Sequence, residues 1–436
     1  MRIPARIIVP VSLAVFLAGL LIAFVWWQIS KSTAILSDPL SFMRIEPEAS
    51  GTIMETPVDP RDKALFHLRQ GDLFAIRGEW KDAQAEFEKA VDENGGLPAL
   101  RKLAQAQLQR RDIKGVRSTI NKLQSAGARR EDLILLESIV ELRAGELVKA
   151  QSILESSADS PQKHYGLAIL SIIKGDHASA KSELSQVISG WEPVLRSNAR
   201  ILQSAYDEFS LFPEGSNLHL ITLLSRSMAQ VQECELALPL LVQVTSAMED
   251  YRDAWIVQGY CELVTERFES ALASFEQAYN IDPQKPEIQY FLARAYASME
   301  QHQNAITFLE YSLVNGFEPK SEARRLIARE ALSIGNTALA LDQYEILAED
   351  ENAAIEIFSG LISASMALGN SDEAYMKAKE AVERWPDDPR ALELLGWVSM
   401  ETGRKDEALS ALQKALAINP EMKEAKKRLE ELESKR

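Results

Sequence analysis

Residues that build catalytic and metal sites are scarce in this chain of 436 residues. The two cysteines are too few for a disulfide-rich scaffold and form no CxxC pair, and the five histidines form neither an HxxxH nor an HExxH pattern. The sequence also lacks a GxSxG nucleophile motif, a phosphate loop and a glycine-rich dinucleotide motif. We therefore expect a protein that is not an enzyme and that holds no metal and no cofactor.

Basic residues are outnumbered by acidic ones. The chain has 48 Lys and Arg against 64 Asp and Glu, a formal net charge of −16, which argues against general nucleic-acid binding. Apolar residues make up 46% of the chain, enough for a core, so wholesale disorder is excluded. No stretch combines alternating polarity with β-branched residues, and the sequence therefore predicts no sheet.

One long apolar run lies near the N-terminus. Nearly all residues from Ile7 to Ile29 are apolar and none is charged, and as a helix these 23 residues would be roughly 35 Å long, enough to cross a bilayer. Trp26 and Trp27 stand near its end, where aromatic rings favour the headgroup boundary. We interpret residues 1–30 as a transmembrane anchor. The alternative is a signal peptide cleaved near Ser32-Thr33-Ala34, whose apolar region would usually be shorter.

The charges that flank this run predict its orientation. Arg2 and Arg6 precede it, and this slight basic excess favours a cytoplasmic N-terminus. The protein would then be a single-pass inner-membrane protein whose body is extracytoplasmic, which is periplasmic in a two-membrane bacterium. Residues 31–62 contain four prolines and few apolar groups, which predicts a tether without a regular helix.

A repeat near 34 residues long dominates the rest of the chain. In ten places a small residue, replaced once by Ile362, is followed twelve positions later by a second small residue and then, after four more, usually by a bulky apolar one. Two small side chains let two helices approach closely, and the bulky residue fills the space beside them. The clearest examples are Gly259, Ala271 and Phe275, and Gly396, Ala408 and Leu412.

This pattern resembles the tetratricopeptide repeat (TPR) family, and with the apolar run in front of it the chain is similar to bacterial inner-membrane-anchored TPR proteins. The resemblance covers residues 64–420; it is strong at 252–316 and 388–420 and degenerate at 98–190. It implies an all-α solenoid of about ten helix-turn-helix repeats behind one N-terminal transmembrane helix. It also implies a concave inner face that binds other proteins, without indicating a particular ligand.

The spacing of the repeats is interrupted once, because Ala168 and Ser225 lie 57 residues apart. We expect an additional helix from about residue 193 to 211, followed by a turn. The predicted organisation is an anchor at 1–30, a Pro-rich tether at 31–62, a first block of four repeats at 63–190, a joining helix and turn at 191–216, a second block of six repeats at 217–420 and a capping helix at 421–436.

The resemblance places a set of aromatic and arginine side chains on the concave face of the second block. Such side chains contribute most of the binding energy at many protein interfaces. In the alternative interpretation, the arginines pair with Glu287 and Glu322 and the tyrosines only edge the core. The candidate groove residues are Tyr260, Tyr290, Arg294, Arg325, Arg329 and Trp397.

A second candidate surface is basic. Residues 98–130 carry nine basic residues and one acidic residue, Asp112. This segment is a candidate docking patch for an acidic protein segment or for anionic lipid near the bilayer. The alternative is a solvated face, or one whose charges pair with acids of adjacent repeats. The candidate patch residues are Arg101, Lys102, Arg110, Arg111, Lys114 and Arg117.

The two cysteines, Cys234 and Cys261, fall on neighbouring predicted helices that run antiparallel. In an oxidising compartment they are candidates for a disulfide. The alternative is that both are small core residues without a covalent partner.

These features together predict a membrane-anchored TPR scaffold that binds one or more partner proteins for assembly of an envelope-associated complex. The bilayer is its second partner, through the N-terminal helix, and nucleic acid is not expected. One alternative is a cytosol-facing TPR chaperone or regulatory adaptor. Another is an accessory subunit of a biosynthetic or secretion enzyme complex.

Overall fold

The computed structural model describes residues 63–76, 79–212, 214–420 and 422–434. Within these ranges the chain forms 22 helices and no strand, which confirms the predicted all-α fold. The predicted anchor and tether at 1–62 lie outside the described residues. Among the helices that are described, none combines the length and the apolar character that crossing a membrane requires.

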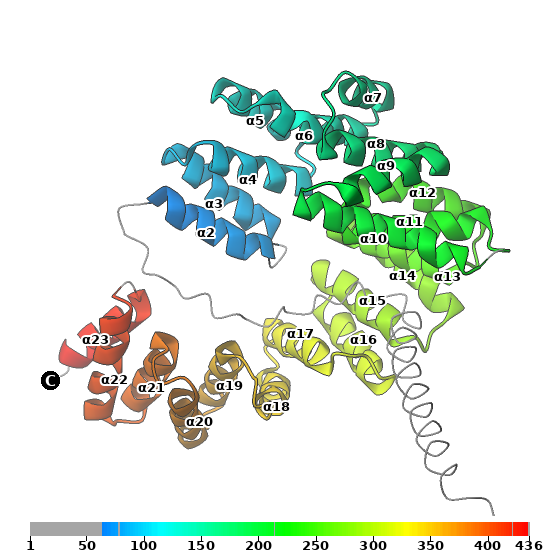
Figure 1. Cartoon of the computed structure of the whole chain (residues 1–436). Coiled ribbons are helices and arrows are strands. Elements are labelled where there is room, and N and C mark those ends of the chain that lie inside the picture. The colour runs from blue at the N-terminus through cyan, green and yellow to red at the C-terminus, as the bar shows by residue number, and fades with distance from the viewer. Residues whose placement is uncertain (1–62, 77–78, 213, 421, 435–436) are drawn as a thin grey trace, which may run out of the picture. The chain divides into compact units, whose positions relative to one another are not determined.

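The chain divides into two compact units, Met1–Ala247 and Met248–Arg436, each described here by itself (Figure 1). The helices of unit 1 are α2 (Lys63–Ile76), α3 (Trp80–Asp92), α4 (Gly96–Gln109), α5 (Ile113–Ser125), α6 (Arg130–Arg143), α7 (Leu147–Glu155), α8 (Pro161–Lys174), α9 (His177–Ser189), α10 (Pro193–Ser210), α11 (Asn217–Gln230) and α12 (Cys234–Ala247).

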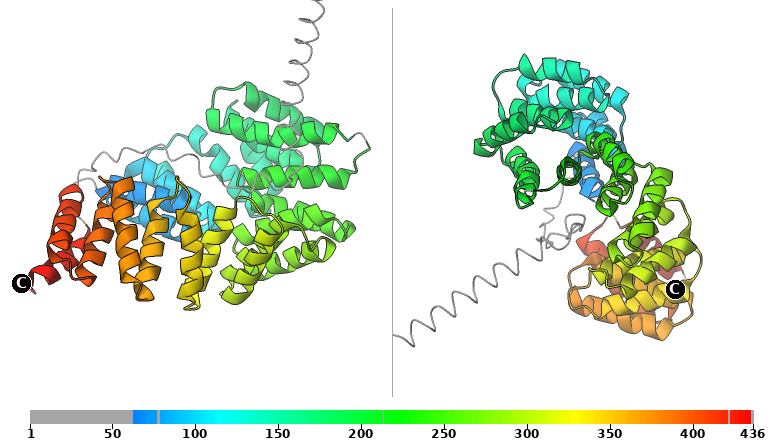
Figure 2. Two further views of the ribbon diagram at one scale, coloured as in Figure 1. Left: turned by 90° about the horizontal axis from the view of Figure 1, so that it is seen from below. Right: turned by 90° about the vertical axis from the view of Figure 1, so that its right-hand side faces the viewer.

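Unit 2 continues as a row of helices that stand side by side in chain order, as Figure 2 shows for α15 to α23. Its helices are α13 (Arg252–Val264), α14 (Phe268–Ile281), α15 (Pro286–Ser298), α16 (His302–Val314), α17 (Lys320–Ser333), α18 (Thr337–Ala348), α19 (Ile355–Ala367), α20 (Ser371–Arg384), α21 (Pro389–Glu401), α22 (Lys405–Ile418) and α23 (Lys423–Ser434).

The hairpin of α8 and α9 shows how the sequence sets helix ends. Ser160 caps α8 by accepting a hydrogen bond of 3.2 Å from the backbone N–H of Lys163, and Pro161 supplies the first helical residue. Gly175 follows the last turn with a φ of 74°, a left-handed conformation that favours glycine. Asp176 then caps α9 through the N–H of Ser179 at 3.1 Å, so the turn between the helices is short.

The small residues of the repeats lie where their spacing predicted. All ten residues at the second small position have no exposed surface, and nine of them are alanine. At the first small position, a Cβ added to Gly259 would lie 2.7 Å from the ring of Phe275, and one added to Gly396 would lie 2.6 Å from Leu412. The two helices of these hairpins therefore approach too closely for a larger side chain.

The helix α10 falls in the region where the repeat spacing is interrupted. It is 18 residues long and packs against α8, α9 and α11. One face of α10 is apolar and turns toward the core: Leu195, Ala199 and Leu202 are buried, whereas Ser197 and Arg200 are exposed.

A polar contact within unit 1 joins helices that are far apart in the sequence. The Arg143 guanidinium of α6 forms an ion pair of 3.1 Å with Glu233, just before α12, and donates a bond of 2.7 Å to the C=O of Leu108. Their side chains are only 4% and 9% exposed. Arg111 and Glu235 form a second ion pair beside the first. The first compact unit ends with α12, and the predicted division into blocks joined at 191–216 stays a prediction.

Candidate protein-binding surfaces

Tyr290 on α15 is part of the core rather than of an open groove. Its ring is 4% exposed and stacks on Phe317 with centroids 4.2 Å apart. Its hydroxyl donates to the carboxylate of Glu322 on α17. Burial raises the pKa of Tyr290, and the charge of Glu322 acts in the same direction, so the phenol remains a neutral donor. This placement corresponds to the alternative in which the tyrosine edges the core.

Tyr260 on α13 reaches the same group of rings from the preceding hairpin. It meets Phe291 edge to face with centroids 5.8 Å apart, and Phe291 in turn contacts Tyr290 at 5.4 Å. Phe291 also stacks on Phe275 of α14 at 5.5 Å. The rings of three successive helices of unit 2 thus form one continuous aromatic group.

The three candidate arginines are at least partly exposed, and one of them, Arg294, lies beside this aromatic group. The guanidinium of Arg294 is 5.9 Å from the ring centroids of both Tyr290 and Phe291. Arg325 and Arg329 are exposed on α17, and Arg329 donates to its sequence neighbour Glu330 at 2.8 Å while 64% of its side chain stays exposed. The charges of Arg294 and Arg329 both oppose the rise in the pKa of Tyr290, which places them near its hydroxyl.

Trp397 does not belong to this group. The guanidinium of Arg428 on α23 lies over its ring, 5.2 Å from the centroid, and forms an ion pair with Glu393. The ring packs partly buried against the apolar core of the C-terminal hairpins. The final helix therefore covers a residue that the sequence placed among the groove candidates.

Most of the predicted basic patch is engaged locally. Lys114 is exposed. The other five candidates contact acidic or amide side chains of other helices or of the next turn: Arg101 contacts Asp132, Lys102 contacts Asp72, Arg110 contacts Gln84, Arg111 contacts Glu235 and Arg117 contacts Glu141. This pattern matches the alternative of local pairing, and docking of an acidic segment or of anionic lipid on this patch stays a prediction.

Both cysteines are buried, Cys234 at the start of α12 with 4% exposed and Cys261 in α13 with 0%. They belong to different units. A disulfide between them stays a prediction.

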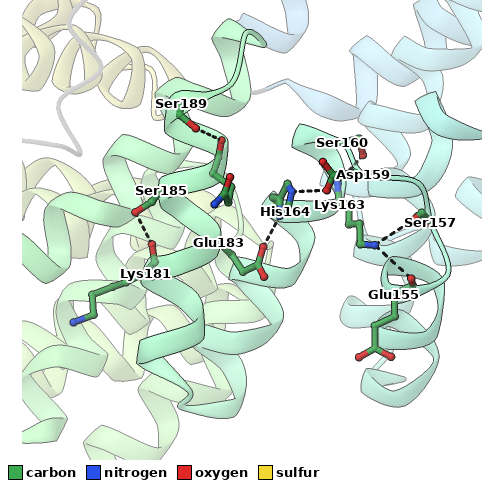
Figure 3. Close-up of polar contacts among 11 residues, drawn as sticks. Glu155, Ser157, Asp159, Ser160, Lys163, His164, Lys181, Glu183, Ser185 and Ser189 are labelled. Carbon is green, nitrogen blue, oxygen red and sulfur yellow. Dashed lines mark hydrogen bonds and ion pairs between the residues drawn. The ribbon is translucent and has the colours of Figure 1, made fainter.

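The histidines have a role that sequence reasoning missed. His67 and His164 each contact a glutamate 19 residues further along, Glu86 at 2.7 Å and Glu183 at 2.6 Å, across the two helices of a hairpin. Figure 3 shows His164 between Glu183 and Asp159, and its distance to Asp159 is 2.8 Å. The shared spacing was the available signal. Nowhere in the described part of the chain do His, Cys, Asp or Glu form a group of three suited to a metal ion.

Comparison with known families agrees with this geometry. Two family models, both described as tetratricopeptide repeat, match the sequence, one at residues 223–286 and 359–423 and the other at residues 262–330. The chain is therefore a protein with tetratricopeptide repeats at these residues, a TPR protein in that sense. The predicted resemblance to the TPR family is confirmed, and the matched residues include the stretches 252–316 and 388–420, where the pattern is strong.

Several solved structures are similar to this TPR protein. YrrB, a TPR protein with an unusual peptide-binding site, is 18% identical and aligns with 43% of this chain and 96% of its own, with a TM-score of 0.38. The type IV pilus biogenesis factor PilW is 17% identical over 49% of this chain and 99% of its own, with a TM-score of 0.39. Yeast Tom70 is 12% identical over 85% and 95%, with a TM-score of 0.32. No protein of curated function matches the sequence.

Proposed function

We propose that this TPR protein is a scaffold that binds partner proteins and catalyses no reaction, and that Arg294, Arg325 and Arg329 form one of its contact surfaces. We name these three residues the arginine cluster. TPR proteins generally bind other proteins, and the observation that carries this proposal is the partly exposed Arg294 guanidinium beside the aromatic rings, with exposed Arg325 and Arg329 on α17. Arginine beside aromatic rings is a common composition of binding hot spots.

The chemistry of the arginine cluster favours an acidic segment of a partner. A guanidinium group binds a carboxylate through two parallel hydrogen bonds, which gives both energy and direction. Glu322, the acid nearest to Tyr290, already accepts a hydrogen bond from the Tyr290 hydroxyl. Arg329 keeps 64% of its side chain exposed despite its bond to Glu330, and Arg325 is exposed, so both can still meet carboxylates from outside the protein.

The proposal extends to location. We infer that the apolar run Ile7–Ile29 holds the protein in the inner membrane and that the repeats lie on the periplasmic side, where they help to assemble an envelope-associated complex. The length of the run and the positions of Arg2 and Arg6 support this arrangement. A C-terminal reporter that is active only in the periplasm should be active, and alkaline carbonate should not extract the protein. Activity of a cytoplasm-only reporter instead would overturn the orientation.

The arginine cluster is tested by removing two of its charges. In Arg325→Ala/Arg329→Ala, recovery of cross-linked partner proteins should fall about tenfold, because hot-spot arginines often contribute more than 1 kcal/mol each. The measurement is cross-linking in intact cells, purification of the full chain and quantitative mass spectrometry.

The matched control for this experiment is Lys405→Ala/Lys414→Ala, which removes the same charge from exposed positions of α22. We expect this control to recover partners as the unaltered protein does. If both variants retain or lose the same partners equally, the arginine cluster is not a specific contact surface.

A further inference from the structure

A second group of aromatic side chains lies at the surface of unit 2, on α14, α15 and α16. Phe308 is at its centre, with ring centroids 5.6 Å from Tyr279, 5.4 Å from Tyr296 and 5.9 Å from Tyr311. The Tyr296 ring stacks on Phe308, whereas Tyr279 and Tyr311 meet it edge to face. Four rings from three helices thus form one cluster, which we name the outer aromatic cluster.

The outer aromatic cluster is not enclosed by the protein. Tyr311 is 48% exposed, and Val314, one turn further along α16, is 84% exposed. Tyr279, Tyr296 and Phe308 are partly exposed. Rings that pack against one another while remaining open to solvent present a rigid apolar surface, so little side-chain entropy is lost when a partner covers it.

This surface is distinct from the arginine cluster. Tyr296 and Arg294 are two residues apart on α15, which places them about 200° apart around the helix axis. Arg294 and Tyr296 therefore point to different sides of α15, and we expect a partner segment on one surface not to compete for the other.

The charge around the outer aromatic cluster is negative. Unit 2 contains 21 basic and 35 acidic residues, a balance of −14, whereas unit 1 contains 27 and 29, a balance of −2. Glu276 of α14 and Glu310 of α16 are exposed on the helices that carry the cluster. The Glu276 carboxylate lies 3.4 Å from the Tyr296 hydroxyl, which donates to it. The Glu276 carboxylate therefore borders the rings, and Glu310 is the sequence neighbour of Tyr311 on α16.

We propose that the outer aromatic cluster, with Glu276 and Glu310, docks a segment of a partner protein that is rich in arginine and lysine. The faces of Tyr and Phe rings attract guanidinium and ammonium groups, and the apolar stems of Arg and Lys cover the rings. The carboxylates add attraction for the same charges and repel acidic segments. This binding does not depend on the arginine cluster, whose partner segment is acidic.

The test uses the full chain in detergent micelles and a fluorescein-labelled dodecapeptide, four repeats of Arg-Leu-Lys, with fluorescence anisotropy as the readout. Tyr311→Ala should weaken binding about fivefold or more, and Tyr311→Phe, which keeps the ring, should bind as the unaltered protein does. An acidic counterpart, four repeats of Glu-Leu-Glu, should not compete. Equal binding of both peptides, or no effect of Tyr311→Ala in a protein with unchanged helix content, overturns the proposal.

Two pairs of charge variants separate docking at the cluster from general attraction to an acidic protein. Glu276→Gln/Glu310→Gln should weaken binding of the basic peptide. Glu349→Gln/Glu351→Gln makes the same change in net charge at exposed positions after α18 and should leave binding unchanged. If the two pairs weaken peptide binding equally, the interaction depends only on net charge, and the proposal is overturned. Arg325→Ala/Arg329→Ala should leave this peptide's binding unchanged, so the two binding surfaces can fail independently.

Discussion

Gly259 lies at a close approach between the two helices of its hairpin. A Cβ at this position would be 2.7 Å from Phe275, whose side chain is fully buried and cannot move aside without displacing its neighbours. Phe275 also stacks on Phe291 of the next hairpin. Strain introduced at Gly259 is therefore passed to the contact between two repeats.

We predict that Gly259→Ala lowers the free energy of unfolding by about 1–3 kcal/mol, the usual cost of adding a methyl group to a packed core. Chemical denaturation of the full chain, followed by circular dichroism, measures the change. In Gly259→Ala/Phe275→Leu the smaller side chain makes room for the methyl group, so the loss should be less than the sum of the two single losses. Additive losses would show that the two side chains do not compete for the same space.

The residues that pack each hairpin could be predicted from the sequence, and those at the surface only in part. Small and bulky positions recur with the repeat because every hairpin solves the same packing problem. The surroundings of Tyr290 and Trp397 could not be predicted from the repeat. Tyr290 is covered by Phe317 from a loop, and Trp397 by Arg428 from the final helix. The outer aromatic cluster arises from three helices and has no local sequence pattern.

At the scale of elements, one polar contact joins helices that are distant in the sequence. Arg143 of α6 reaches Glu233 beside α12 and the C-terminal end of α4, where it donates to the C=O of Leu108. Burial raises the pKa of Glu233, although the charge of Arg143 opposes this. A cation buried in this way stabilises the packing of α4, α6 and α12 only while its acceptors remain in place.

We expect Arg143→Met to destabilise unit 1 by about 3–5 kcal/mol, because the acceptors of the guanidinium are left buried without a donor. Adding Glu233→Gln to this variant should restore part of the loss by removing a buried group that can ionise. Arg129→Ala, which removes a mostly exposed arginine paired with Asp132, serves as the control and should leave stability unchanged. Thermal melting of the three variants decides the matter, and a loss no larger in Arg143→Met than in Arg129→Ala would contradict it.

At the scale of the whole molecule, the two units differ in charge. The order of helices along the chain could be predicted from the spacing of small and bulky residues, including the additional helix α10. The end of unit 1 could not, because it depends on which helices contact one another, including helices as distant in the sequence as α6 and α12. Periodicity within a repeat carries no information about contacts at that distance.

We predict two unfolding transitions in scanning calorimetry of the full chain, because repeats stabilise mainly the neighbours they touch. Arg143→Met should lower only one of the two transition temperatures, and Gly259→Ala only the other. A single transition that both variants shift equally would mean that the two units unfold as one cooperative body.

The ten fully buried small residues at the second position of the repeats have a consequence for sequence variation. Each side chain is fully buried, so a longer one would have to displace packed neighbours. In a complete substitution scan of this chain, we therefore expect the tolerance of amino-acid substitutions to fall sharply at ten sites. These sites are 30–35 residues apart, except for one interval of 57. At those sites glycine should be the least harmful replacement for alanine, while every longer side chain is rejected.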